Sequence, residues 1–264
     1  MPPAAAADTN PVMIRDLRTI LEGWEFEPGK ISVRKIVGRD GREKIQTRID
    51  LGVLQLECHG RPDGQRPHGF ESLLDYHEHR LREHVATHGD DEDFVVGPED
   101  CRELRHEAYL YYQRYLSSFV LEEYAAVERD TARNLRAIEF CERYAARAAD
   151  RKALRSQRCY VTMMHARAQT YLALEDGRPE AALAAVEDGL ARVRAAAGRD
   201  ESLAAREVDT LLQLRGEVLA RLPGDAPARL EHELHEALMV EDYERAARLR
   251  DRLQTLADGL ERDA

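Results

Sequence analysis

The sequence lacks the patterns that mark membrane-spanning and exported proteins. No run of about 18 uncharged apolar residues occurs, and the opening MPPAAAADTN has no basic region before an apolar core. Lysine is scarce, with 4 lysines against 35 arginines. Because arginine is abundant throughout, an arginine-rich patch is a weaker sign of phosphate binding here than in other chains. These absences predict a cytoplasmic protein without a membrane segment.

Paired cysteines and catalytic motifs are missing as well. The four cysteines are scattered without a CxxC pair, which favours isolated thiols in a reducing compartment over a disulfide framework. No GxxxxGK[ST] loop, HExxH or GxSxG motif occurs, and the carboxylates are spread as helix-surface charge. We therefore expect no catalytic residues, no cofactor and no enzyme activity.

The composition that is present is that of a folded soluble protein. Of the 264 residues, 43% are hydrophobic, which is ample for a conventional core. The formal net charge of −11 argues against a whole surface built for nucleic acid. Any binding of a polyanion must therefore be local.

The amino-terminal part predicts a small β unit with flanking helices. Residues 1–10 are mostly small and predict a flexible tail, and residues 11–89 form the predicted β-hairpin plus helix unit. The helical periodicity over 12–22 changes to alternation, and Asp40-Gly41 supplies a hairpin turn. The alternation continues from Ile45 to Leu51 in the second strand, and a third short strand follows.

Beyond this unit the chain predicts helices almost throughout. A helix at 70–88 precedes an acidic linker, residues 90–100, and a helical region covers residues 101–222. The periodicity within that region indicates helices over 101–120, 122–149, 151–175, 179–197 and 201–222. Because the breaks are short, successive helices are expected to lie antiparallel. The expected fold is mainly α: an antiparallel, repeat-like helical stack with a small N-terminal β-hairpin unit and a C-terminal helical hairpin.

One helix pair has an internal pattern. Small and large apolar residues flank a Gly-containing turn, with Ala168, Tyr171 and Leu172 before it and Ala181, Ala182 and Leu190 after it. This pattern resembles the tetratricopeptide repeat, in which small residues let two helices approach closely. The region 101–222 is therefore interpreted as tetratricopeptide-like.

The amino-terminal hairpin is locally basic. Residues 30–66 hold nine basic residues against five carboxylates. A cationic β-ribbon can follow phosphates, although exposed aromatic residues for base stacking are absent between Phe26 and Phe70. The candidates for nucleic-acid contact are Arg34, Lys35, Arg39, Arg42 and Lys44. The alternative is a docking surface for the acidic linker.

Histidine is concentrated near the end of the same unit. Six of the ten histidines lie from His59 to His88. His84 and His88 are spaced i and i+4, close enough on a helix to share a metal ion. Without a second compact ligand pair, we favour solvated histidines and assign no metal ligands.

The last segment, residues 226–260, has the pattern of a helical hairpin. Apolar residues fall at i, i+4, i+7 and i+8 from Leu230 to Leu238. Asp242 stands where a helix N-cap is expected, and apolar residues recur at spacings of three and four after Ala246. Two such stripes predict an a/d seam between two helices.

The core of this segment, EDYERAARLRD, resembles the UVR motif. That motif is a helical hairpin of the excinuclease B and C subunits, of an activator of the bacterial protein-arginine kinase and of some Clp-type unfoldases. It pairs there with another such hairpin, so the resemblance implies binding to a protein partner. No helicase or nuclease part of those subunits is recognisable here, and neither are the zinc-binding CxxC pairs of the activator. The residues assigned to partner binding are Leu234, Ala237, Glu241, Asp242, Tyr243, Ala246, Leu249, Arg250, Leu253 and Leu256.

The expected function is that of a bacterial non-enzymatic adaptor. Its partner is a protein with a UVR-type hairpin, or a second copy of itself, in nucleotide excision repair or regulated proteolysis. The alternative is a nucleic-acid-binding repair accessory that uses the basic amino-terminal hairpin. A third interpretation is that the carboxyl hairpin only caps its own helical stack, with the UVR-like residues packed inward.

Overall fold

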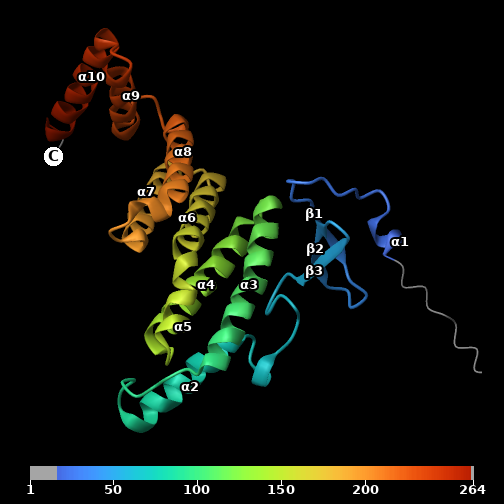
Figure 1. The fold of residues 1–264 in the computed structure, drawn as a ribbon. Helices are drawn as coiled ribbons and strands as arrows, with labels where there is room; N and C mark the ends of the chain where they lie inside the picture. Colours follow the sequence, from blue (N-terminus) through green and yellow to red (C-terminus); the bar gives the residue numbers. More distant parts are fainter. Residues whose placement is uncertain (1–16, 263–264) are drawn as a thin grey trace, which may run out of the picture.

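The fold in the computed structural model, which describes residues 17–262, is mainly α, as predicted. Figure 1 shows a small sheet at one end, a row of helices, and a separate helical hairpin at the other end. The predicted flexible tail, residues 1–10, lies outside the described residues, as does much of the helix expected over 12–22. Within that expected helix, Arg18–Leu21 forms the short helix α1.

The sheet has three antiparallel strands in sequence order, β1 (Val33–Val37), β2 (Glu43–Ile49) and β3 (Gly52–Glu57). Ile45 pairs with Leu56, so the predicted hairpin and third strand are both present. Gly41, in the first turn, has a φ of 74°, which a residue without Cβ adopts at low cost. The strand ends at Ile49, however, and Leu51 lies in the next turn with 89% of its surface exposed. The expected alternation up to Leu51 is therefore too long.

Three helical hairpins make up most of the chain. They are α3 (Pro98–Val120) with α4 (Tyr124–Tyr144), α6 (Arg158–Glu175) with α7 (Pro179–Ala197), and α9 (Pro227–Met239) with α10 (Tyr243–Arg262). The remaining helical elements are η1 (Pro67–Gly69), α2 (Leu73–His88), α5 (Ala148–Ala153), η2 (Arg155–Gln157), η3 (Glu201–Ala204) and α8 (Ala205–Arg221).

All three hairpins turn in the same way. The turn residues have positive φ: Glu122 (59°), Gly177 (68°) and Glu241 (58°). The following amide reaches back five residues to a carbonyl, from Glu123 to Ser118 (2.9 Å), from Arg178 to Ala173 (2.8 Å) and from Asp242 to Ala237 (2.8 Å). This is the Schellman ending of a helix, which satisfies its last carbonyls. The repetition of one turn supports a repeat-like organisation, while the tetratricopeptide resemblance stays a prediction.

The helix expected over 122–149 is broken. α4 ends at Tyr144, and Ala145 is extended because it forms a parallel bridge with Val96. The Val96 amide donates to the Tyr144 carbonyl (2.7 Å), and the Ala146 amide donates to the Val96 carbonyl (3.0 Å). The helix expected over 151–175 likewise begins only at Arg158. The acidic linker is thus anchored to the end of α4, with Val96 fully buried.

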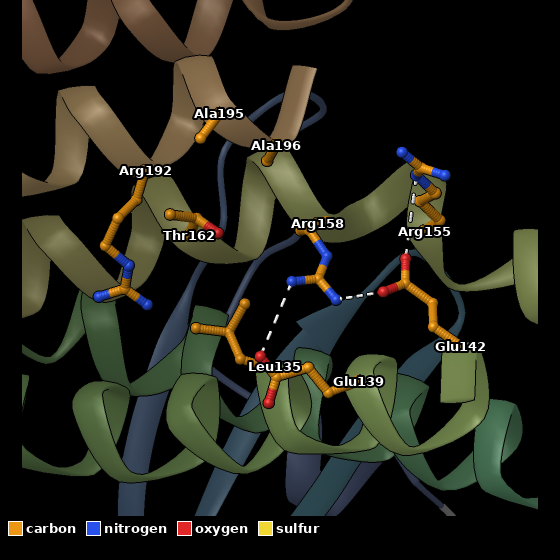
Figure 2. A pocket seen from close by; sticks show the side chains of 9 residues that line it. All are labelled: Leu135, Glu139, Glu142, Arg155, Arg158, Thr162, Arg192, Ala195 and Ala196. Carbon is orange, nitrogen blue, oxygen red and sulfur yellow. Dashed lines mark hydrogen bonds and ion pairs between the residues drawn. The ribbon is translucent and has the colours of Figure 1, made fainter. Parts of the chain in front are cut away.

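Close packing of small residues joins α6 to α7. A Cβ placed on Gly189 would lie 2.3 Å from the Cβ of Ala166, so only glycine permits this approach without a shift. Ala168 and Ala182, two of the predicted small positions, are fully buried. A cavity of about 500 Å³ lies beside this hairpin, where α6 and α7 meet α4 (Figure 2).

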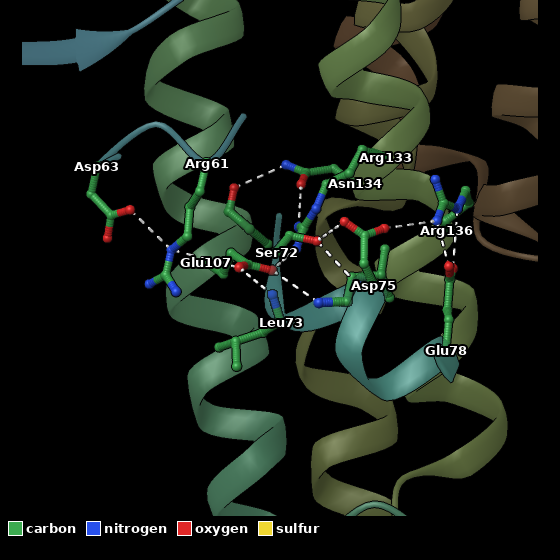
Figure 3. A network of polar contacts seen from close by, with 12 residues as sticks. Arg61, Asp63, Ser72, Leu73, Asp75, Glu78, Glu107, Arg133, Asn134 and Arg136 are labelled. Atoms are coloured by element: carbon green, nitrogen blue, oxygen red, sulfur yellow. Dashed lines mark hydrogen bonds and ion pairs between the residues drawn. The ribbon is translucent and has the colours of Figure 1, made fainter. Parts of the chain in front are cut away.

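Buried ion pairs hold α2 and the loop after the sheet against the stack (Figure 3). Glu107 on α3 is fully buried and pairs with Arg133 on α4. Its carboxylate also accepts hydrogen bonds from the amides of Leu73 (2.7 Å) and Leu74 (3.3 Å), the first residues of α2. The Nε of Arg61 lies 3.6 Å from the same carboxylate. One buried carboxylate therefore positions three segments of the chain.

Replacing Glu107 with alanine is expected to lower the free energy of unfolding by about 3–5 kcal/mol, because Arg133 would stay buried without its counter-charge. Urea unfolding followed by circular dichroism measures the loss. Glu78→Ala is the matched control, since Glu78 pairs with the half-exposed Arg136 at 2.6 Å and should cost about 1 kcal/mol or less. Equal losses for the two variants would contradict the role assigned to Glu107.

Candidate partner-binding hairpin

The carboxyl-terminal hairpin has a hydrophobic core of its own. Leu230 and Ala237 from α9 pack with Ala246 and Leu249 from α10, and each is at most 6% exposed. The rest of this cluster is half-buried and comprises Leu234, Leu253 and Leu256. Among the described side chains, this cluster contains none from the helical stack. The predicted seam between two helices is therefore present.

The seam changes the role of several residues that were predicted to contact a partner. Ala237, Ala246 and Leu249 are buried between α9 and α10 and can reach a partner only if the hairpin opens. Leu253 and Leu256 lie in the same seam. Their positions assign them to the stability of the hairpin, because two helices of this length need a shared apolar seam to stay folded. Of the predicted set, Glu241, Asp242, Tyr243 and Arg250 are exposed.

The turn between the two helices is fixed by its backbone and one carboxylate. Glu241 adopts a φ of 58°, in the left-handed region that ends a helix. Asp242 accepts a hydrogen bond from the amide of Arg245 (3.0 Å), so it caps α10 as predicted. The turn therefore has a defined backbone conformation.

Four large apolar side chains around this turn are exposed, and we call this group the tip. They are Leu238, Met239, Val240 and Tyr243, with exposed fractions of 49%, 72%, 73% and 66%. Tyr243 was among the predicted contact residues, and Met239 and Val240 were not. Leu238 was predicted to share the apolar stripe of α9, but it lies outside the seam and is half exposed. The signal was present, since three consecutive apolar residues cannot all face a seam with helical spacing.

Arginine side chains join the hairpin to the end of α8. Arg229 donates to the carbonyl of Leu222 (2.8 Å) and to the carboxylate of Glu233 (2.9 Å). Arg245 on α10 also pairs with Glu233, at 3.4 Å. These contacts, the Arg229 hydrogen bond first, lower the pKa of Glu233 below its usual value. Arg252 reaches the carbonyl of Gly224 at 3.3 Å.

The hairpin does not lie along the stack as a cap. Figure 1 shows α9 and α10 beyond α8, at the far end of the molecule from the sheet. The seam residues do pack inward, as the capping interpretation requires, but they pack against one another. The tip is left uncovered by the described part of the chain.

Two of the five basic candidates in the amino-terminal hairpin are neutralised by carboxylates. Lys44 is buried and pairs with Glu57 and Asp40, and Lys35 pairs with Glu43 and Glu123. Of the other three candidates, Arg34 donates to Gln46 (2.9 Å) and lies over the ring of Trp24. The side chains of Arg39 and Arg42 are exposed at the turn. The surface is not docked to the acidic linker, because residues 90–100 pack at the other end of α4.

The histidines contribute to packing and aromatic stacking. The rings of His84 and His88 stack with centroids 4.1 Å apart, and His84 also contacts Phe94. His77 is buried beside Arg80, and burial lowers its pKa. Within residues 17–262, no three His, Cys, Asp or Glu side chains are grouped so that they could hold a metal ion. A search of that same part of the chain finds no helix long and apolar enough to cross a membrane.

The fold and the tip define the carboxyl terminus as a helical-hairpin module with an uncovered apolar end. Residues 228–258, which are this module, match the family model of the UVR motif, described as the UvrB/uvrC motif. The resemblance read from the sequence is therefore confirmed for the hairpin. Comparisons with curated proteins and with solved structures find no match.

Replacing Leu249 with alanine is expected to destabilise the hairpin by about 2–5 kcal/mol, because the seam loses a buried leucine. Hydrogen exchange should then lose protection in α9 and α10 while α3 to α7 keep theirs, since the two cores are separate. Met239→Ala, at the exposed tip, serves as the control and should leave both regions protected. A loss of protection across the whole chain would contradict a separate hairpin core.

The ion pairs of Glu233 with Arg229 on α9 and Arg245 on α10 should weaken in acid. Because the pKa of Glu233 is lower in the folded chain than in the unfolded one, its contribution is fully present above about pH 4.5 and is lost as the pH falls further. Hydrogen exchange of α9 between pH 6 and pH 3 measures the acid-induced opening of the hairpin. Glu233→Gln should remove part of the pH dependence; an unchanged profile would contradict the assignment.

Proposed function

We propose that the chain is a non-enzymatic adaptor that binds a partner protein through the tip of its carboxyl-terminal hairpin. The observation that carries this proposal is the exposed apolar group of Leu238, Met239, Val240 and Tyr243 at a turn that no other described element covers. Contiguous exposed apolar side chains on a soluble protein mark sites of interaction. Tyrosine and methionine are also suited to such contacts, because one combines an apolar ring with a hydroxyl and the other adapts its shape.

The surroundings of the tip support a protein partner. Glu241, Asp242 and Glu244 are exposed next to the apolar group in the sequence, and the exposed Arg245 and Arg248 follow on α10, so charges of both signs flank the apolar residues. This is the usual arrangement of a protein interface, with an apolar core inside a polar rim. The match to the UvrB/uvrC motif supports a partner that carries a second UVR-type hairpin, in another protein or in a second copy of this chain. The name of that motif favours DNA repair as the setting, and regulated proteolysis is the second setting.

Binding of nucleic acid by the amino-terminal hairpin receives less support. Lys35 and Lys44, two of its five candidate residues, already pair with carboxylates. A lysine must give up such a pair before it can bind a phosphate. We therefore propose the protein-binding function and leave this ribbon without a role in it.

A double variant at the tip tests the proposal. Met239→Ser with Tyr243→Ser should weaken capture of a UVR-hairpin protein from a bacterial extract by at least about tenfold, as expected when apolar anchors are lost. Self-association of the purified chain, followed by light scattering over a range of concentrations, should weaken equally if the partner is a second copy.

The matched control changes two exposed leucines far from the tip. Leu203→Ser with Leu212→Ser removes side chains that are 66% and 45% exposed on η3 and α8, and it should leave capture unchanged. Unimpaired binding by the tip variant, or equal loss in both variants, would reject the tip as the binding surface.

A further inference from the structure

A second surface, opposite in character to the tip, lies where the chain bends between α4 and α6. Six basic residues and one carboxylate occur within residues 143–158: Arg143, Arg147, Arg151, Lys152, Arg155 and Arg158, with Asp150. The whole chain has a formal net charge of −11, so this segment is a local reversal of sign along the sequence. The acidic linker meets it at the bridge of Val96 to Ala145. Because α4 stops at Tyr144, Arg151 and Lys152 lie on the short helix α5 and Arg155 lies on η2.

Most of these cations are accessible. The lone carboxylate, Asp150, is neutralised from α3 by Arg105 at 2.7 Å. Arg147 and Lys152 are exposed, and neither forms an ion pair with a described residue. Arg151 is exposed and donates to the carbonyl of Ala145 at 2.6 Å, which leaves its charge uncompensated. The other three are paired: Arg143 with Asp91 at 2.5 Å, and Arg155 and Arg158 with Glu142.

The bend continues into the cavity between α4, α6 and α7. Arg155, Arg158 and Arg192 line this space of about 500 Å³, and Figure 2 shows Arg158 between the other two. Glu142 is shared, at 2.5 Å from Arg158 and 3.9 Å from Arg155. Glu139 lies 4.0 Å from Arg158, and Asp188 lies 3.5 Å from Arg192, so the charges of the arginines in the cavity are balanced by carboxylates. Arg155 lies in the bend, on η2, and also lines the cavity, so the bend and the cavity adjoin at this residue.

The remaining side chains of the bend indicate the class of ligand. Between residues 146 and 157, the exposed residues other than the cations are alanines, Ser156 and Gln157. Leu154 is buried, and the large apolar side chains that anchor protein interfaces are missing from the exposed part of this segment. An exposed aromatic residue for stacking on single-stranded bases is missing there too. Cations without anchors fit a phosphate backbone, which is bound by charge alone.

We propose that the bend at residues 147–155 binds the phosphate backbone of double-stranded nucleic acid without reading its sequence. This site is separate from the tip, so it adds a second binding activity to the proposed adaptor. It is also separate from the amino-terminal ribbon, whose lysines are engaged in ion pairs.

Fluorescence anisotropy with a labelled DNA duplex, titrated with the full chain over a range of salt concentrations, tests the proposal. Arg147→Gln, Lys152→Gln and Arg155→Gln together should weaken binding by at least about tenfold. They should also reduce the steepness of the plot of log K against log salt concentration by about 0.9 for each lost phosphate contact, or about 3 in total. The control removes three charges elsewhere, by Lys30→Gln, Arg39→Gln and Arg42→Gln, and should change affinity less than about twofold. A further variant, Arg147→Lys with Arg155→Lys, keeps the charge and should keep most of the binding.

Several outcomes would overturn this assignment. Equal weakening by the bend variant and the control would mean that only net charge matters. Polyglutamate competing as well as the duplex would make the surface a site for acidic protein, and tighter binding to vesicles with anionic headgroups would make it a site for membrane. Absence of duplex binding at low salt would remove the site altogether. The tip variant, Met239→Ser with Tyr243→Ser, should bind the duplex like the unchanged chain, so the two proposals can fail independently.

Discussion

The guanidinium of Arg114 holds together parts of the molecule that are far apart in the sequence. It is 1% exposed and donates to both carboxylate oxygens of Asp130 on α4, at 2.6 and 2.9 Å. It also donates to the carbonyls of Glu57 (2.9 Å) and Gly60 (2.7 Å), at the end of the sheet. Separating these groups would leave a buried charge unpaired, which costs several kcal/mol. Arg114 therefore fixes the end of the sheet on α3 and α4, where the hydrogen bond between Thr47 and Ser117 (2.7 Å) and the Lys35–Glu123 ion pair add to its contacts. The ion pairs of Glu107 extend the same constraint to α2.

Features that depend on neighbouring residues could be predicted from the sequence. The carboxyl hairpin is the clearest case, because its seam and the capping residue Asp242 all lie within one short segment. The β-hairpin around Gly41 and the bounds of α7 follow from equally local signals. The common turn of the three hairpins was visible for one pair only, since Gly177 is a recognisable signal whereas Glu122 and Glu241 take the same left-handed conformation without glycine. Those two residues are held there by the reach-back hydrogen bonds of the turn and by packing of the helices on either side.

Features that depend on distant partners could not be predicted. The alanines from Ala145 to Ala149 are good helix formers, and only the bridge to Val96 ends α4 before them. The basic character of the amino-terminal hairpin is a property of composition, but the buried pairing of Lys44 with Glu57 is a property of strand register. The same limit applies to the candidate site. The residues of the UVR motif were correctly located on a hairpin, yet helical spacing alone could not divide them between the seam and the tip, because that division depends on which face α9 and α10 turn toward each other.

The two proposed binding surfaces use different physical interactions, and this difference has a consequence for how they can act together. The tip presents apolar side chains, whose contribution to binding is largely insensitive to salt, whereas the bend presents charges whose contribution falls as salt rises. The tip belongs to the hairpin that Arg229 and Arg252 join to the end of α8. The bend belongs to the helical stack and follows α4 in the chain. A partner at the tip therefore need not compete with a polyanion at the bend, and neither site requires the other to be occupied. Simultaneous occupation would bring a protein and a nucleic acid to fixed places on one scaffold, which is a task for an adaptor and needs no catalytic group.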